Sequence, residues 1–575
     1  TNPSVVMASR ASLLLLLLSA SSAAYSLAGP RHPGRRGLSR QALVLCTPRP
    51  PTPRQLNGHI ITAATVDGIL QLHAVHGDAL DDINLSTCWS RLGRIATNAD
   101  RRRLLQDPAL LAPLARQTAA ALDDWGPWGV SATAHAAAKL RLEGGPYEAL
   151  WSKLGTAAAA SARDFNCQGL ANTAWAFATV GRPEPVLFDR LAAASEPMLS
   201  DFPSFALGQL LWAFAAAGAE AASLFDASAA ELSAGRLKEL SPQGVSMVAW
   251  AFATAGRPAP ALFEAIADEA APRLAEFAPQ GLANLAWAFA ASGARGSAQR
   301  RLFAALAAES PSRLATFKTR ELANLAWACA KTGLAPRALF EALGEEVARR
   351  ASAFSVPDMS MTAWAFASAG HAAPAMFDAL AEAATPRARE CSGQAIANLA
   401  WAYATARHAS PSLYSALASM AASRARDLSP QAVSNIAWSF ATASHPLAET
   451  HLLLDALGAA AQRRLGRFKP QELANLCWAF ARVRLPSPSL LNALAEEAAR
   501  RLDAFSGQGV ATLAWSYATL QHAQPNLFDA IAAEAAPRLR RFSPQAILTC
   551  GECAGCVPGR EGVGCRLLKP TAAPG

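Results

Sequence analysis

The sequence predicts an all-α protein built as an α-solenoid, a superhelix of tandem helix-turn-helix repeats of about 38 residues. The first observation is a period, because ten tryptophans follow one another at intervals of 37 to 40 residues. Such a period is the signature of stacked repeats that each contact mainly their neighbours. The second observation is that apolar residues in each unit recur three and four residues apart, as on the buried face of a helix. The ten tryptophans are Trp175, Trp212, Trp250, Trp287, Trp327, Trp364, Trp401, Trp438, Trp478 and Trp515.

The composition agrees with such an array and excludes other classes. Of the 575 residues, 52% are hydrophobic and 17% are charged, which is enough apolar material for a core. The only uninterrupted apolar run is shorter than the ~18–20 residues that a membrane span needs, so we expect no membrane protein. The formal net charge of +9 comes almost entirely from arginine and weakly favours an acidic partner.

Residues 1–66 are predicted to be a targeting leader and linker. Met7 is followed by a short apolar core, Leu13 to Leu18, and by small residues suited to cleavage by signal peptidase. An arginine-rich stretch without acidic residues then extends to Arg40. This order resembles the bipartite signal and transit presequence of algae with complex plastids, which implies import into the plastid (chloroplast) stroma. The mitochondrion and ordinary secretion are the alternatives.

Each repeat is predicted to contain two helices. Helix A carries the tryptophan, and six repeats place glycine six residues later, where a left-handed C-cap suits a residue without a side chain. Helix B follows, and a proline such as Pro272 ends or kinks it before a short turn. The expected organisation is degenerate helical repeats over 67–165, with His135 in the tryptophan slot, ten repeats over 166–541, and a truncated repeat with a Cys/Gly-rich tail over 542–575.

Numbering each repeat from its tryptophan, position 0, reveals columns of equivalent residues. Positions −6, −3, +1 and +4 are predicted to share one side of helix A, and +1 is always Ala or Ser, which leaves room for a ligand. Amides and charged groups there can contact one RNA base per repeat. The nearly uniform amides at −3 have an alternative interpretation, a hydrogen bond to main chain between repeats. The predicted base-contacting residues are Asn172, Gln209, Asn284, Asn324, Asn398, Asn435 and Asn475 at −3, Glu321, Asp358 and Glu472 at −6, and Lys331 and Arg482 at +4.

A column of arginines stands fourteen residues before the tryptophan position in nine consecutive repeats. Guanidinium groups match phosphate geometry, so we predict that this arginine column binds the phosphates of an RNA strand. The alternative is a set of solvated helix ends, where the helix dipole favours a cation. The column consists of Arg236, Arg273, Arg313, Arg350, Arg387, Arg424, Arg464, Arg501 and Arg538.

Repeats headed Pro-Gln-x-Leu-Ala-Asn-Leu-Ala-Trp-Ala-Phe-Ala closely resemble the octotricopeptide repeats of algal organelle proteins, over roughly residues 166–549. These are related to the heptatricopeptide and FAST-kinase-like RAP proteins of organelles. The resemblance implies an α-solenoid that binds single-stranded organellar RNA and controls the stability, processing or translation of particular transcripts. Other RNA-processing proteins of the organelle are possible partners. Many relatives end in a RAP domain, for which the tail after Leu548 is too short.

Signatures of catalysis and of metal binding are weak or absent. The sequence has no phosphate loop, no His-Glu-x-x-His and no Gly-x-Ser-x-Gly, so we predict that the protein is not an enzyme. Four histidines seven residues past their tryptophans are too far apart to share a zinc ion, and we expect them to be turn residues. They are His371, His408, His445 and His522.

The cysteines also favour a protein without metal. Cys550, Cys553, Cys556 and Cys565 have a spacing compatible with a metal, but no histidine accompanies them, and we expect neither a metal nor a cofactor. Most other cysteines, and the tryptophans, are expected to pack in the core. The rival function is a protein-binding scaffold of the armadillo or TPR kind that takes an acidic peptide on the same surface.

Overall fold

The structure is a computed structural model that describes residues 51–334, 336–443 and 447–538. In these ranges the ordered elements are helices and turns, without a strand, which confirms the predicted all-α class. Most of the leader and the cysteine-rich tail lie outside the described residues, so the predictions made for them stay predictions. Helix α2 (Pro53–Thr62) lies inside the segment 1–66 that we assigned to leader and linker. No described helix is both long and apolar enough to cross a membrane.

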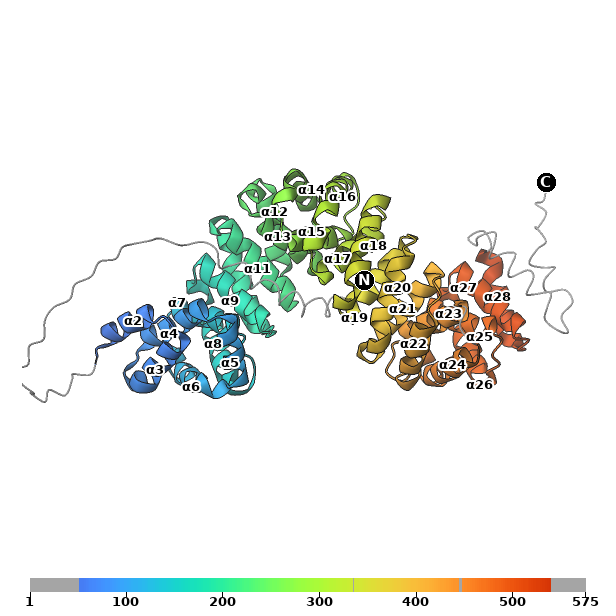
Figure 1. Cartoon of the computed structure of the whole chain (residues 1–575), viewed down its shortest axis with the longest axis horizontal. Helices are drawn as coiled ribbons and strands as arrows, with labels where there is room; N and C mark the ends of the chain where they lie inside the picture. The colour runs from blue at the N-terminus through green and yellow to red at the C-terminus, as the bar shows by residue number, and fades with distance from the viewer. Residues whose placement is uncertain (1–50, 335, 444–446, 539–575) are drawn as a thin grey trace, which may run out of the picture. The chain divides into compact units, whose positions relative to one another are not determined.

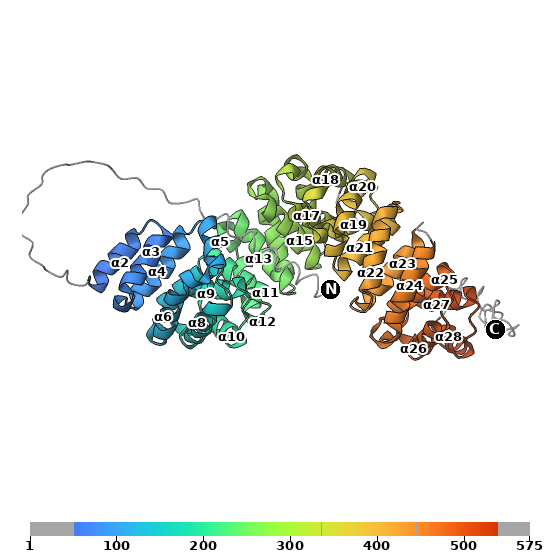
Figure 2. The same ribbon diagram turned by 60° about the horizontal axis from the view of Figure 1, so that its bottom comes forward.

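The chain divides into two compact units, residues 1–299 and 300–575, and the division falls within α16 (Ser297–Glu309). In unit 1 the helices of layer A pack side by side in chain order, and helices B form the second layer (Figures 1 and 2). After α2, the helices A are α4 (Asp82–Ile95), α7 (Pro127–Lys139), α9 (Cys167–Thr179), α11 (Ser204–Ala217), α13 (Pro242–Thr254) and α15 (Pro279–Ala291). The helices B are α3 (Val66–His76), α6 (Ala112–Ala121), α8 (Glu148–Ala160), α10 (Pro185–Ser195), α12 (Ala222–Ser233) and α14 (Pro260–Ala270), and a short α5 (Asn98–Gln106) precedes α6.

Unit 2 repeats the same arrangement with six further helices A, whose neighbours pack against one another as in unit 1 (Figure 2). They are α17 (Thr319–Thr332), α19 (Val356–Ser368), α21 (Gly393–Ala406), α23 (Pro430–Thr442), α25 (Pro470–Arg482) and α27 (Gly507–Thr519). The helices B of unit 2 are α18 (Arg337–Arg350), α20 (Pro374–Ala384), α22 (Pro411–Ser423), α24 (Leu447–Gln462), α26 (Pro488–Ala499) and α28 (Pro525–Arg538).

Local sequence sets the ends of helix A. A serine before the first turn accepts a hydrogen bond from the main-chain N–H three residues on, as Ser429 does from Ala432 at 3.2 Å. At the other end the six predicted glycines adopt positive φ, between 63° and 69°. Glycine takes this left-handed conformation without the steric cost that a Cβ adds, so the predicted C-caps are confirmed.

Helix B ends as predicted, and a short 3₁₀ segment leads to the next repeat. In one repeat α14 stops at Ala270, and Pro272 lies in the first turn of the 3₁₀ helix Ala271–Glu276. Proline fits there because the first turn of a helix needs no N–H donor. The turn returns the chain to the start of the next helix A.

The core between consecutive repeats combines small and aromatic residues. The residue at +2, usually Phe, packs edge-to-face on an aromatic ring of the preceding helix B, as Phe366 does on Phe340 with ring centroids 5.1 Å apart. Alanines at +1, such as Ala402, are fully buried where the next helix A approaches closely. Each repeat therefore buries its apolar face only against its neighbours, which explains why the sequence period is so regular.

Candidate nucleic-acid interface

Among the described residues of unit 2, one stripe of helix A reaches solvent along its whole length, and it contains positions −7, −3, 0 and +4. In α21, Gln394 at −7 is exposed, while Asn398, Trp401 and Thr405 are half-buried. The positions between them are almost all buried in a core of Ile, Leu and Ala. Steps of four, three and four residues keep side chains on one face of an α-helix, so this stripe is the surface that a ligand can contact.

The predicted ligand side of helix A was rotated by about one residue from the observed one. Positions −6 and +1 are buried: Ala402 at +1 has 0% exposure, and Glu321 and Asp358 at −6 have 4% and 3%. Position +1 therefore leaves no room for a ligand, and Glu321 and Asp358 are covered. The tryptophan at 0 and the residue at −7 take their places on the exposed side.

The acidic residues at −6 cap their own helix. Glu321 accepts a hydrogen bond from the main-chain N–H of Lys318 at 2.8 Å, and Glu472 accepts one from Lys469 at 2.8 Å. Asp358 forms an ion pair with Arg320. Position −6 is the third residue of helix A, where a carboxylate satisfies N–H groups that have no partner within the helix. Burial raises the pKa of Glu321. The structure therefore shows capping for Glu321 and Glu472 and an ion pair for Asp358, and not a free group for base contact.

The amides at −3 are half-buried in every repeat that carries one. In the first two, Asn172 accepts from Gln168 at 2.8 Å and from Gln209 at 3.3 Å, and Gln209 also reaches a main-chain carbonyl at 3.4 Å. Among the described residues, the other five amides make no hydrogen bond, so the alternative of a main-chain bond does not apply to them. Their donors and acceptors face solvent. These five residues are Asn284, Asn324, Asn398, Asn435 and Asn475.

The tryptophans at position 0 form a ladder of indole rings beside the amides. In five pairs of neighbouring rings the centroids lie 6.2–6.4 Å apart and the rings are inclined by 28–31°: Trp212–Trp250, Trp250–Trp287, Trp364–Trp401, Trp438–Trp478 and Trp478–Trp515. Such offset pairs are favourable for aromatic rings. Trp212, Trp250 and Trp287 are 2–8% exposed, which confirms the prediction that they belong to the core. The other seven rings are half-buried, so each also presents a part of its surface to solvent.

Sequence reasoning missed the column at −7, where seven of the ten repeats carry glutamine. Helical spacing of seven residues from the tryptophan is the signal that places this glutamine on the exposed stripe. The glutamines are exposed or half-buried, and they are Gln168, Gln243, Gln280, Gln394, Gln431, Gln471 and Gln508.

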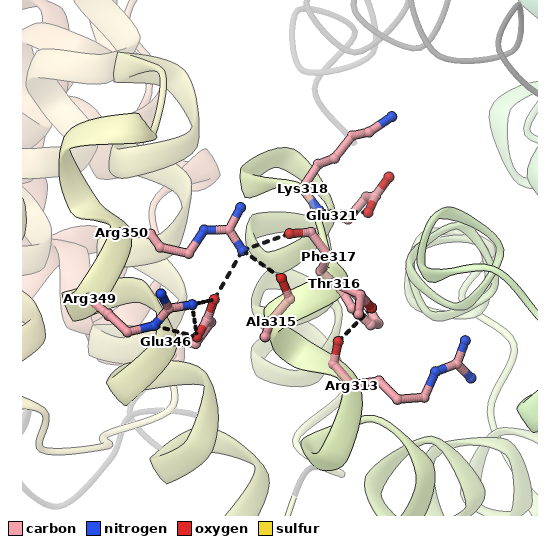
Figure 3. A network of polar contacts seen from close by, with 9 residues as sticks. All are labelled: Arg313, Ala315, Thr316, Phe317, Lys318, Glu321, Glu346, Arg349 and Arg350. Atoms are coloured by element: carbon pink, nitrogen blue, oxygen red, sulfur yellow. Dashed lines mark hydrogen bonds and ion pairs between the residues drawn. The ribbon is translucent and has the colours of Figure 1, made fainter.

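The arginine column lies where helix B ends, and it joins consecutive repeats. Figure 3 shows Arg350, whose guanidinium donates to the main-chain carbonyl of Phe317 at 2.8 Å and to Glu346 at 3.0 Å. Its contact to the carbonyl of Ala315 is longer, at 3.5 Å. Both carbonyls belong to the turn that ends the preceding repeat. Lysine has no planar fork of donors for several acceptors at once, which explains why arginine recurs here.

Five more arginines of the column donate to main-chain carbonyls of the preceding turn, including Arg387 to Phe354 at 2.7 Å and Arg424 to Cys391 at 2.8 Å. The others of these five are Arg236, Arg464 and Arg501. Arg273 and Arg313 form ion pairs with glutamates of their own helix B or turn. The side chain of Arg538 lies outside the described residues.

The described part of the column is therefore not a row of unengaged guanidinium groups, as the phosphate prediction assumed. Side-chain exposure is only 17% for Arg236 and 23% for Arg350. Main-chain carbonyls at the turns need donors, and the arginines supply them. The structure gives this column a role in joining repeats.

The histidines at +7 are turn residues that contact the preceding repeat. His408 lies 2.8 Å from Asp378, His522 lies 2.7 Å from Asn492, and His371 stacks on Phe340. His445 lies outside the described residues. Within the described ranges, no cluster of His, Cys, Asp or Glu could hold a metal ion.

The described cysteines are free thiols buried in the helices and turns, which confirms that they pack as small core residues. Burial raises the pKa of Cys329 and of Cys477 to about 12. The five are Cys88, Cys167, Cys329, Cys391 and Cys477.

The two helical layers and the repeated columns define the class of this protein, which is an α-solenoid of tandem helical repeats. Comparison with known protein families and with curated proteins finds no match. One similar structure is a homology model of the full-length AP-3 complex in an intermediate open conformation, with 11% identity, coverage of 90% of this chain and 92% of the other, and a TM-score of 0.27. Another is the crystal structure of the pentatricopeptide repeat protein PPR10 in complex with an 18-nt psaJ RNA element, with 12% identity, coverage of 87% and 88%, and a TM-score of 0.24.

Proposed function

We propose that this protein binds single-stranded RNA along the exposed stripe of helices A and acts in the post-transcriptional control of plastid or mitochondrial transcripts. The observation that carries the proposal is the row of half-exposed amides at −3, from Asn324 to Asn475 in unit 2, which have no hydrogen-bond partner among the described residues. Each amide offers two donors and an acceptor, which is what the edge of an unpaired base requires.

The neighbouring columns add to this surface. The half-buried indole rings at position 0 offer apolar area against which a base can lie. Position +4 varies from repeat to repeat, with Lys331, Ser368, Thr405 and Arg482 among its residues, and all of them reach solvent. A variable position beside a constant amide can distinguish one base from another, so the stripe supports recognition of about one base per repeat.

The uniformity of the amides favours a second candidate, a peptide-binding scaffold. Asparagine stands at −3 in six of the ten repeats, and a constant side chain suits a ligand whose own chemistry is constant, such as the main chain of an extended peptide. The two candidates differ in a measurable way. RNA recognition requires that substitutions along the stripe change the preferred base sequence.

Selection from a random pool of single-stranded RNA, with sequencing of the fraction bound by the full chain, tests the proposal. We expect an enriched motif of about ten nucleotides. In the double variant Asn398→Ala, Asn435→Ala the preference at two positions of the motif should relax. Asn526→Ala is the matched control, because Asn526 is an exposed amide on α28, away from the stripe.

Two outcomes decide between the candidates. If no RNA is retained at moderate salt, RNA binding is wrong and the peptide scaffold is the remaining function. If RNA is retained without an enriched motif, the amides do not distinguish bases. The organelle is tested separately: a fluorescent protein fused behind residues 1–66 should enter the plastid, and its secretion from the cell would contradict that location.

A further inference from the structure

A second row of cations lies at the C-terminal end of helices A, at position +4 of the amide stripe and at +6, just beyond it. In the twelve helices from α4 to α27, positions +4, +5 and +6 contain seven lysines and arginines and no aspartate or glutamate. For α4, alignment of the buried Leu85 and Leu92 with Leu170 and Phe177 of α9 places Ser90 at position 0. We name these residues the basic edge, and they are Arg94, Lys139, Arg141, Lys331, Arg407, Arg482 and Arg484.

Five residues of the basic edge differ from the arginine column in their contacts. Lys331, Arg407, Arg482 and Arg484 are exposed in unit 2, and none of them forms an ion pair or a side-chain hydrogen bond within the described residues. Arg94 in unit 1 is likewise exposed and without such a partner. Their charges are therefore available to an anion, whereas the guanidinium groups of the arginine column are already bonded.

Three of these arginines occupy a backbone conformation that disfavours them. Arg141, Arg407 and Arg484 stand at +6 with φ of 58°, 52° and 54°. Six other repeats have glycine at this position. A side chain at positive φ costs conformational energy that glycine avoids. Gln521 at +6 has the same conformation, with φ of 50°, so the strain points to a function of a long polar side chain at this position, which is arginine in three of the four cases.

In unit 1 the edge contains a cluster of cations. Burial lowers the pKa of Lys139, and the nearby charges of Arg101 and Arg94 lower it further. Arg101, on α5, donates only to the side chain of Asn98, at 3.3 Å. Three positive groups near one another repel, and a bound anion relieves that repulsion.

We propose that the basic edge, and not the arginine column, carries the phosphates of the RNA strand, an inference that rests on the proposed function. Position +4 lies one helical turn, about 6 Å along the axis, beyond the tryptophan. A backbone held there has its bases beside positions 0 and −3. The helix dipole alone favours a cation at +4, but it does not explain arginine in a left-handed conformation at +6.

Salt-dependent binding of the full chain to a uridine 30-mer tests the inference. The edge variant combines Arg407→Gly, Arg482→Ala and Arg484→Gly. The matched control, Arg337→Ala with Arg349→Ala and Arg500→Ala, removes three charges from α18 and from the C-cap of α26 in the same unit. If each edge arginine engages one phosphate, the slope of log K against log salt should become shallower by about 0.7 × 3 ≈ 2. Such a change means about 100-fold weaker binding at 0.1 M salt if the two lines meet at 1 M.

The outcomes separate this inference from the function on which it rests. Wild-type chain that does not bind RNA overturns both. Wild-type chain that binds, with an edge variant of unchanged slope, overturns only the inference. Damage to the fold of the edge variant would appear as a lower melting temperature. Glycine at positive φ should leave the melting temperature equal or higher. The slope could instead become shallower when Arg350, Arg387 and Arg424 are changed to alanine in a chain that stays folded. That result would show that the arginine column binds the phosphates.

Discussion

Replacing Arg350 by alanine should destabilise the junction between the end of α18 and the turn before α17 without changing how strongly the protein responds to salt when it binds RNA. The substitution removes the donor of the Phe317 carbonyl, 2.8 Å away, and one of the two arginine partners of Glu346. A hydrogen bond with a charged group contributes about 1.5–3 kcal/mol, and a carbonyl left without a donor costs about 1–3 kcal/mol.

The expected loss is smaller than most of the range that the two contributions would give if they were added, about 2.5–6 kcal/mol. The Arg350 side chain is 23% exposed, so water can replace part of the lost bonding, and Glu346 keeps Arg349. We therefore expect a loss of about 2–3 kcal/mol in the free energy of local opening. Arg350→Lys keeps the charge but loses the planar fork, and it should recover about half of the loss.

Native-state hydrogen exchange of the main-chain amides in α17 and α18 measures this free energy directly. A loss of about 2–3 kcal/mol corresponds to exchange about 30- to 150-fold faster. Arg337→Ala is the control, because that side chain is 85% exposed and its ion pair with Glu341 should contribute nothing measurable. Unchanged exchange in Arg350→Ala, together with a shallower salt slope of RNA binding, would refute the joining role.

Three further outcomes follow from the same structure. Gly370→Ala should lower stability by about 1–2 kcal/mol in thermal unfolding, since φ is 65° there, and an unchanged melting temperature would contradict the C-cap argument. Burial, with the charge of Lys139, lowers the pKa of His135 to about 4. Since an unfolded histidine takes up its proton near pH 6.5, stability should fall as pH falls from about 6.5 to 4, and His135→Gln should flatten that pH dependence in urea titrations. Cys329 and Cys477 should resist iodoacetamide at pH 8 until the chain unfolds, because the thiolate is the reactive form; rapid labelling of the folded chain would show that these helices open.

The sequence was sufficient for the period, the two helices of each repeat and the glycine C-caps, because these depend on local spacing and on backbone conformation. It was not sufficient to predict which face of helix A reaches solvent. Alanine stands on several sides of that helix, so its apolar face has no sharp boundary in the sequence. Close packing between helices determines which side is buried. Ala402 is buried because a neighbouring helix approaches it, and the larger Trp401 beside it stays half-exposed.

The arginine column shows a different limit of the sequence. A recurring cation suggests an anionic ligand, yet its acceptors here are main-chain carbonyls of the preceding turn, such as those of Phe317 and Phe354. Every residue has a carbonyl, so no sequence pattern marks those that lack a donor. The position of the turn relative to the next helix B is a property of the packed array, and only the structure supplies it.

The separation of the exposed stripe from the core has a consequence for how such a protein can change its ligand. Residues at −7, −3 and +4 contribute little to packing, whereas the alanines and leucines between them are fixed by their neighbours. Mutations at the stripe therefore escape most of the selection that protects folding. A lineage can substitute, duplicate or delete single repeats and so acquire new targets by small steps, while the scaffold that presents the new surface stays the same.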